Sequence, residues 1–283
     1  MKTAVQILTM FSAETPVVTV SAAASRFGLT ASASSRLLAS LASSGIVQRG
    51  PDRAYRPGPL AYRLGLLYHA HNRLADLIND GARKIVGETG KTCWVSVLSG
   101  LNTMLISRFP GPMEQGFYLD AGKMLPANAS AAGKALMARL PDPEVIKLLN
   151  SAKLEAWTTK SKTDVATILA DVEEVRQRGW GIIAGELLEN VISIAVAFSA
   201  PLEMASMALS VSVYSNDLEE VARSIASLTQ VAREIGDKIS DPFWTDRPLL
   251  PAQAAIVAEI HRYIALSEEE RTGSGAAHRT QRA

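Results

Sequence analysis

The stretch 17–50, VVTVSAAASRFGLTASASSRLLASLASSGIVQRG, constrains the fold most, because it encodes two short helices joined at a sharp corner. Thr19 is suited to cap a helix over residues 20–27, and Gly28 adopts at little cost the left-handed backbone that ends it. A second helix is expected over residues 30–43, where leucines recur at helical spacing. The pattern therefore predicts a helix-turn-helix.

The flanking segments extend this pattern to a winged helix-turn-helix. Apolar positions of MKTAVQILTMFSA fall on one helical face and predict a helix over residues 3–13. Two strand-like runs follow at 46–49 and 54–57, and the sequence GPDR between them suits a tight hairpin turn. We expect this domain to occupy residues 1–58.

The exposed face of the second helix is poor in charge and rich in small residues, which suits a helix in the major groove of DNA. A groove about 12 Å wide lets the backbone approach closely only where the outward side chains are small. Serine hydroxyls can bond to phosphates or base edges, and nearby arginines can reach phosphates or guanine. The candidate DNA contacts are Arg26, Ser32, Ala33, Ser35, Arg36, Arg49 and Arg53. The alternative is a small three-helix packing module whose serines are merely solvated.

Charge is divided unevenly along the chain. Residues 1–65 hold seven basic and two acidic residues, a formal charge of +5, whereas the whole chain carries +1. A basic first domain and a mildly acidic remainder favour a polyanion, here double-stranded DNA, as partner of the first domain alone. Ordinary charge fluctuation over a short segment is the alternative explanation.

The rest of the chain predicts an α+β domain behind a linker. A long helical segment follows the hairpin, broken near Gly65 and ending near Gly90. From about residue 92 the apolar period changes to two, and the predicted antiparallel strands TCWVSVLSGLNTMLISRF, VISIAVAF and SMALSVSVY are separated by helices. The expected parts are a linker helix over 59–76, the α+β domain over 77–245 and a C-terminal extension over 246–283. The extension is expected to hold a helix over 252–266 and a disordered end.

No set of residues suggests catalysis, a cofactor or a metal site. Gly133 and Lys134 resemble a phosphate loop, but Asn128 and Ala135 stand where that motif needs glycine and a hydroxyl. Lys134 is therefore expected to be a surface or helix-packing residue. His69 and His71 diverge on a helix, which argues against a shared metal.

The composition favours a cytoplasmic protein without a membrane span. The single Cys93 lies in an apolar run and is expected to be a packed thiol. No apolar run reaches the length of about 18 residues that a membrane helix needs. Gln6 and Thr9 interrupt the N-terminal apolar stretch, which argues against its alternative reading as an export signal.

Two of the predicted strands each have one face made mainly of small or hydroxyl-bearing residues. Ser193, Ala195 and Ala197 lie on one face of VISIAVAF, and Ala208, Ser210, Ser212 and Tyr214 lie on one face of SMALSVSVY. Such faces can be exposed to solvent, but solvent-exposed strand faces more often carry lysine, glutamate or arginine. The absence of these residues here favours the interpretation that the two faces form the floor of a small-ligand cavity.

Taken together, the sequence resembles IclR-type transcriptional regulators along residues 1 to about 240. The resemblance rests on the segments TVSAAASRFGLTASASSRLLASLASSGIVQR, YRPGPLAYRLG, PANASAAGKALMA and RGWGIIAGELLENVISIAVAF with ALSVSV. It implies a winged helix-turn-helix, a linker helix and a GAF-like effector-binding domain. It also implies homodimers, often paired into tetramers, that bind pseudo-palindromic operators. The implied effector-pocket residues are Phe117, Leu125, Ala131, Ala132, Ile183, Ser193, Ser210 and Ser212.

The function expected from this resemblance is transcription regulation, in which a small organic effector modulates operator binding. Acidic residues usual in the family around Ile183 and Ala184 are absent, and the remaining pocket positions are apolar or carry hydroxyls. An aromatic or short monocarboxylic acid is therefore the expected effector class. One alternative is an enzyme domain fused to a DNA-binding head, which would require a nucleophile or an acid–base pair beside the serine face. The other is a scaffold that binds protein through the first helix and the linker.

Overall fold

The computed structural model describes residues 2–12, 14–70, 73–112, 119–199, 206–214 and 217–265. It divides into two compact units, Met1–Arg73 and Leu74–Ala283. Each unit has its own hydrophobic core. The two units are therefore described separately.

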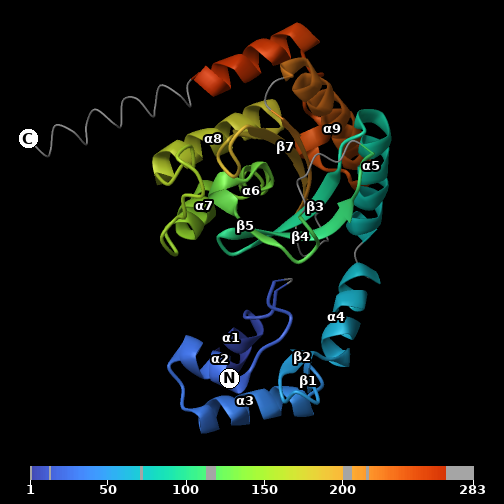
Figure 1. The fold of residues 1–283 in the computed structure, drawn as a ribbon. Helices are drawn as coiled ribbons and strands as arrows, with labels where there is room; N and C mark the ends of the chain where they lie inside the picture. The colour runs from blue at the N-terminus through green and yellow to red at the C-terminus, as the bar shows by residue number, and fades with distance from the viewer. Residues whose placement is uncertain are drawn as a thin grey trace, which may run out of the picture. The chain divides into compact units, whose positions relative to one another are not determined.

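The first unit is helical with one small hairpin (Figure 1). Its elements are α1 (Lys2–Leu8), α2 (Val20–Phe27), α3 (Ala31–Ser43), β1 (Val47–Arg49), β2 (Tyr55–Pro57) and α4 (Pro59–Ala70). The side chain of Thr19 caps α2, that of Thr30 caps α3, and Gly28 has a left-handed φ of 61°. These local features set the corner of the helix-turn-helix as the sequence predicts.

The hairpin closes onto the helices and completes the winged helix-turn-helix. β1 and β2 pair antiparallel, and Val18 bridges to Tyr55, so the chain before α2 joins the wing. The core shared by the helices and the hairpin is built by Ile7, Val18, Ala23, Leu38, Leu41, Val47 and Tyr55. The expected winged fold is confirmed.

Two helix boundaries differ from the sequence prediction. α1 ends at Leu8 instead of residue 13, because Thr9, Met10 and Phe11 form tighter bonds to carbonyls three residues earlier. Gly65 does not break the segment after the hairpin, since it lies inside α4. A single glycine costs a helix only about 1 kcal/mol, which neighbouring residues can offset.

The second unit is built on a six-stranded antiparallel sheet with strand order β5-β4-β3-β8-β7-β6. The strands are β3 (Cys93–Ser99), β4 (Asn102–Phe109), β5 (Met124–Pro126), β6 (Gly181–Ala184), β7 (Val191–Phe198) and β8 (Met207–Tyr214). The helices are α5 (Arg73–Thr89), α6 (Ala131–Met137), α7 (Asp142–Leu149), α8 (Val165–Arg178), α9 (Leu218–Ile239) and α10 (Pro242–Thr245), with the 3-10 turn η1 (Ala127–Ala129). The expected α+β class is confirmed, while the short strands β5 and β6 were not predicted.

The two faces of this sheet pack against different helices (Figure 1). One face forms a large apolar core with α5 and α9, to which β8 contributes Leu209 and Val211. The other face meets α6, and there β7 and β8 present Ala195, Ala197 and Ala208. Alternation along the strands therefore divides each of them between two environments.

A further helix over residues 253–265 packs on the second unit. Ile256, Ile260 and Tyr263 are buried and join the same core cluster as Trp180 and Trp244. The described part of the C-terminal extension is thus an integral layer of this unit. The expected disordered end lies outside the described residues.

Candidate functional site

The packing of one side of α3 against the rest of the unit determines which residues of α3 face outward. Leu38 and Leu41 are buried, and the Ser34 hydroxyl donates to the carbonyl oxygen of Val20 at 2.9 Å, which ties α3 to α2. Ser32, Ser35 and Arg36 are exposed, and Ala33 is half-buried. The candidate contacts on α3 therefore lie on a small-residue face that other parts of the unit do not cover.

The hairpin tip presents basic groups on a fixed turn. The Asp52 carboxylate accepts from both terminal nitrogens of Arg56, at 3.0 and 2.7 Å, and from the Ala54 amide. These hydrogen bonds, that of Arg56 first, lower the pKa of Asp52 to about 2. Arg53 at the tip is exposed and has a left-handed φ of 62°. Arg56, beside the tip, is paired with Asp52 within the turn.

The remaining candidate arginines are also exposed. Arg49 lies with its guanidinium carbon 5.9 Å from the centre of the Tyr55 ring, and its Nε donates to the Arg53 carbonyl at 3.5 Å. Arg26 is exposed in the last turn of α2. Exposed arginines and the small residues on α3 supply the kinds of group that contact a duplex backbone and its base edges.

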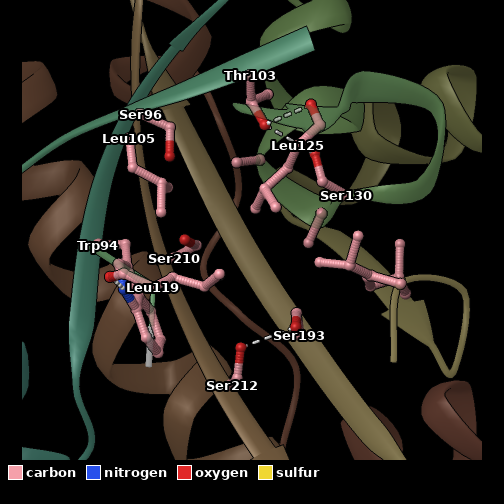
Figure 2. A pocket seen from close by; sticks show the side chains of 14 residues that line it. Trp94, Ser96, Thr103, Leu105, Leu119, Leu125, Ser130, Ser193, Ser210 and Ser212 are labelled. Carbon is pink, nitrogen blue, oxygen red and sulfur yellow. Dashed lines mark hydrogen bonds between the residues drawn. The ribbon is translucent and has the colours of Figure 1, made fainter. Parts of the chain in front are cut away.

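A cavity lies over the serine face of the sheet in the second unit (Figure 2). Its described lining consists of Trp94, Ser96, Thr103, Leu105, Leu119, Leu125, Ser130, Ala131, Ala132, Ile183, Leu187, Ser193, Ser210 and Ser212. Seven of the eight pocket residues implied by the resemblance are in this set. The eighth, Phe117, lies outside the described residues.

The polar groups of the cavity are hydroxyls, and most of them are paired. Ser193 and Ser212 bond to each other at 2.8 Å, while Thr103 bonds to Ser130 at 3.3 Å (Figure 2). Ser130 also caps α6 by accepting from the Gly133 amide. None of the fourteen described lining residues is charged. The cavity therefore suits a ligand that is mostly apolar and carries few polar groups.

The cavity is small. The centre of a water molecule can move through about 30 Å³ of it, which is room for about two waters. Trp94 forms part of the wall, and its indole N–H donates to the Leu119 carbonyl at 3.0 Å. A ligand with an aromatic ring therefore requires lining side chains to move outward.

Sequence reasoning missed half of the lining, for reasons of register. Trp94 and Ser96 lie on β3, where strand pairing aligns them with Ser210 and Ala208 of β8. Thr103 and Leu105 come from β4, where they pair with Leu98 and Ser96, after the pairing register of β3 and β4 shifts between Val95 and Ser96. The two-residue period of β3 could have placed Trp94 and Ser96 on one face of that strand. Only the pairing of β3 with β8 shows that this face lies on the same side of the sheet as Ser210.

Lys134 does not lie at the surface, and of the two roles expected from the sequence the structure supports helix packing, since the lysine joins α6 to Asp171 of α8. Its ammonium group is fully buried, with Nζ 2.7 Å from Asp171 Oδ2 and 2.8 and 2.7 Å from the two oxygens of Glu186. Burial raises the pKa of Asp171, but the charges and hydrogen bonds of Lys134 and Lys162 outweigh it and lower that pKa. These charged groups are not among the cavity's lining residues, so they hold α6 in place without making the cavity charged.

Other chemistry has little support in the described part of the chain. Cys93 is buried on the opposite face of the sheet, and burial raises the pKa of its thiol. Within the described ranges, histidine, cysteine and acidic residues form no group of three or more that could hold a metal. Nor do these ranges contain a helix of the length and apolar character that crossing a membrane demands.

Comparison with known proteins identifies the class to which this fold and cavity belong. Residues 3–51 match the IclR helix-turn-helix domain, and residues 69–241 match the bacterial transcriptional regulator IclR C-terminal domain. The chain therefore belongs to the IclR family of bacterial transcriptional regulators, which confirms the resemblance drawn from sequence motifs.

Individual relatives are distant. The chain is 30% identical over 131 residues to a Cupriavidus necator protein named Probable transcriptional regulator SauR; the match covers 46% of this chain and about half, 52%, of that protein. An IclR transcriptional regulator from Silicibacter sp. TM1040 has the same fold, with a TM-score of 0.76, 23% identity and coverage of 89% of this chain and 98% of that one.

A second solved structure holds a ligand. It is an IclR homologue from Microbacterium hydrocarbonoxydans complexed with 4-hydroxybenzoate, with a TM-score of 0.70, 19% identity and coverage of 84% of this chain and 98% of that one. At these identities both structures establish the fold of the chain.

Proposed function

We propose that this chain is a DNA-binding transcriptional regulator whose operator binding is modulated by a small organic effector in the second unit. The observation that carries the proposal is the uncharged, hydroxyl-lined cavity, present in the same chain as an exposed small-residue recognition helix. Membership of the IclR family supports both halves. The candidate DNA contacts are those of α2, α3 and the hairpin described above.

The effector proposed is an aromatic or short monocarboxylic acid. A di- or tricarboxylate would lose its hydration in a cavity whose described lining offers no cation, which is costly. One anionic or phenolic group could instead be held by hydroxyls of Ser193, Ser210 or Ser212. The 4-hydroxybenzoate complex of the Microbacterium homologue supports this size and polarity.

The oligomer proposed is a homodimer or a tetramer that binds a pseudo-palindromic operator. α4 exposes a set of large apolar side chains, Tyr62, Leu64, Leu66, Leu67 and Tyr68, that a second copy could cover. Residues 59–76 would then link the DNA-binding domain to the effector domain over 77–245. The effector can change DNA binding only by binding one arrangement of the two heads more tightly than another. Such a protein would act in the cytoplasm.

An enzymatic function is less well supported. None of the described lining residues is a histidine, cysteine, lysine or carboxylate, the groups from which an acid–base pair is most often built. The coarser conclusion, that the chain is related to proteins named as transcriptional regulators, does not depend on this argument.

Calorimetric titration tests the effector class. The ligands are benzoate, 4-hydroxybenzoate, butyrate and citrate, each titrated into the wild-type chain and into Ser210→Ala and Ser212→Ala. We expect a monoacid to bind and the variants to weaken that binding. Selective binding of citrate, undiminished in both variants, would contradict the proposal. Operator fragments selected from genomic DNA would then show whether the bound monoacid changes DNA affinity.

A further inference from the structure

The Ser96 hydroxyl differs from the other buried hydroxyls of the cavity. Ser96 lies in β3 and is fully buried, yet its Oγ has no hydrogen-bond partner among the described residues. Figure 2 shows this hydroxyl pointing in among the labelled lining side chains. The paired hydroxyls of Ser193, Ser212 and Ser130 show that the same cavity can satisfy such groups.

An unpaired buried hydroxyl weakens the folded state. Folding removes the group from water without a replacement bond, and alanine at the same place would avoid that cost. Buried polar groups that break this rule need an explanation, and functional sites are among the places where they are expected. Ser96 belongs to the cavity lining, so a molecule that enters as the lining side chains move can supply the missing partner.

Resting on the proposed function, we propose that Ser96 determines effector specificity by hydrogen-bonding a neutral polar substituent of the bound molecule. Its neighbours disfavour a charged partner, because Leu105 lies opposite on β4 and Trp94 is the next residue on the same face of β3. A hydroxyl or carbonyl substituent meets this corner at low desolvation cost, whereas a carboxylate does not. The effector therefore carries a hydroxyl or carbonyl in addition to any acid group.

The first measurement separates this role from a structural one. Ser96→Ala removes an unsatisfied hydroxyl, so we expect a melting temperature equal to or above that of the wild type. Thr229→Val is the matched control: Thr229 on α9 is also buried with an unpaired hydroxyl, but it does not line the cavity. A marked loss of thermal stability in Ser96→Ala alone would show that the hydroxyl supports the fold and would overturn the proposal.

The second measurement is binding of matched probes: benzoate against 3- and 4-hydroxybenzoate, titrated into the wild type and both variants. We expect Ser96→Ala to weaken the better hydroxylated probe by about three- to tenfold, to leave benzoate unchanged, and so to reduce the preference between them. Thr229→Val should preserve that preference. A preference unchanged in Ser96→Ala would overturn the role of Ser96 and leave the proposed function intact. A wild type that binds none of the three would instead contradict an aromatic effector, and with it the role given to Ser96, while binding of butyrate would leave the short-acid part of the proposed function standing.

Discussion

The hydroxyl of Tyr263 donates a hydrogen bond to Glu186 Oε1 at 2.6 Å. This bond joins the helix over 253–265, which lies beyond the family match ending at residue 241, to the turn between β6 and β7. The next residue, Leu187, lines the cavity, and Glu186 also binds Lys134 of α6. Burial, followed by the negative charges of Glu186 and Asp171, raises the pKa of Tyr263, so the phenol remains a donor. A segment outside the shared family region thus bonds to the turn that contributes Leu187 to the cavity lining.

Tyr263→Phe should destabilise the second unit by about 1–3 kcal/mol, because it removes a donor from a buried carboxylate. Urea unfolding followed by tryptophan fluorescence measures this unit alone, since all four tryptophans lie beyond residue 73. His261→Ala changes an exposed position of the same helix and should shift stability by less than about 0.5 kcal/mol. Equal stability of Tyr263→Phe and the wild type would show that the bond contributes nothing.

Truncation should separate two parts of the C-terminal extension. Removing residues 271–283, which mix glycine, serine, arginine and alanine without periodicity, should leave the melting temperature nearly unchanged. Removing residues 252–283 takes away the buried Ile256 and Ile260, each worth about 1.5–3 kcal/mol, and should lower it markedly. If removing residues 271–283 lowered the melting temperature by many degrees, these residues would not be dispensable for folding.

Two arginines of the first unit should affect DNA binding differently. Arg36→Ala on α3 should weaken operator binding and relax preference at one position by about 1–3 kcal/mol. Arg53→Ala at the hairpin tip should weaken binding evenly across sequences and reduce the slope of log affinity against log salt by about 1. Fluorescence anisotropy with specific and scrambled fragments distinguishes the two. If both variants bound like the wild type, the assignment of α3 as recognition helix would be wrong.

Cys93 should be inert in the folded protein. It is buried and burial raises the pKa of its thiol, so the reactive thiolate is scarce at neutral pH. A thiol-specific colorimetric reagent at pH 8 should therefore react slowly with native protein and label one equivalent in guanidinium, because the chain has a single cysteine. Rapid labelling of the native state would show that the β3 face toward α5 and α9 opens readily.

Local signals made the first unit predictable. Capping by Thr19 and Thr30 and the left-handed Gly28 depend on neighbouring residues only, so the sequence displays them directly. The end of α1 was missed because its apolar spacing continues past Leu8, and Phe11 packs against the core from a turn. A hydrophobic pattern shows which side chains are buried without showing where the helical bonds stop.

Long-range contacts limited prediction in the second unit. The short strands β5 and β6 carry too few residues for alternation to be visible, and their identity depends on pairing with β4 and β7. Likewise Lys134 meets Asp171 and Glu186 across 37 and 52 residues of sequence. No local pattern distinguishes such a lysine from a solvated one, because the partners are brought to it only by the fold.

The alternation of β8 has an evolutionary consequence. Its odd-numbered residues, such as Leu209 and Val211, build the core with α5 and α9, while Ser210 and Ser212 line the cavity. Substitutions at the even positions can therefore alter which molecule is accepted while the packing that keeps the domain folded stays untouched. One strand thus allows ligand preference to diversify among descendants of a common scaffold.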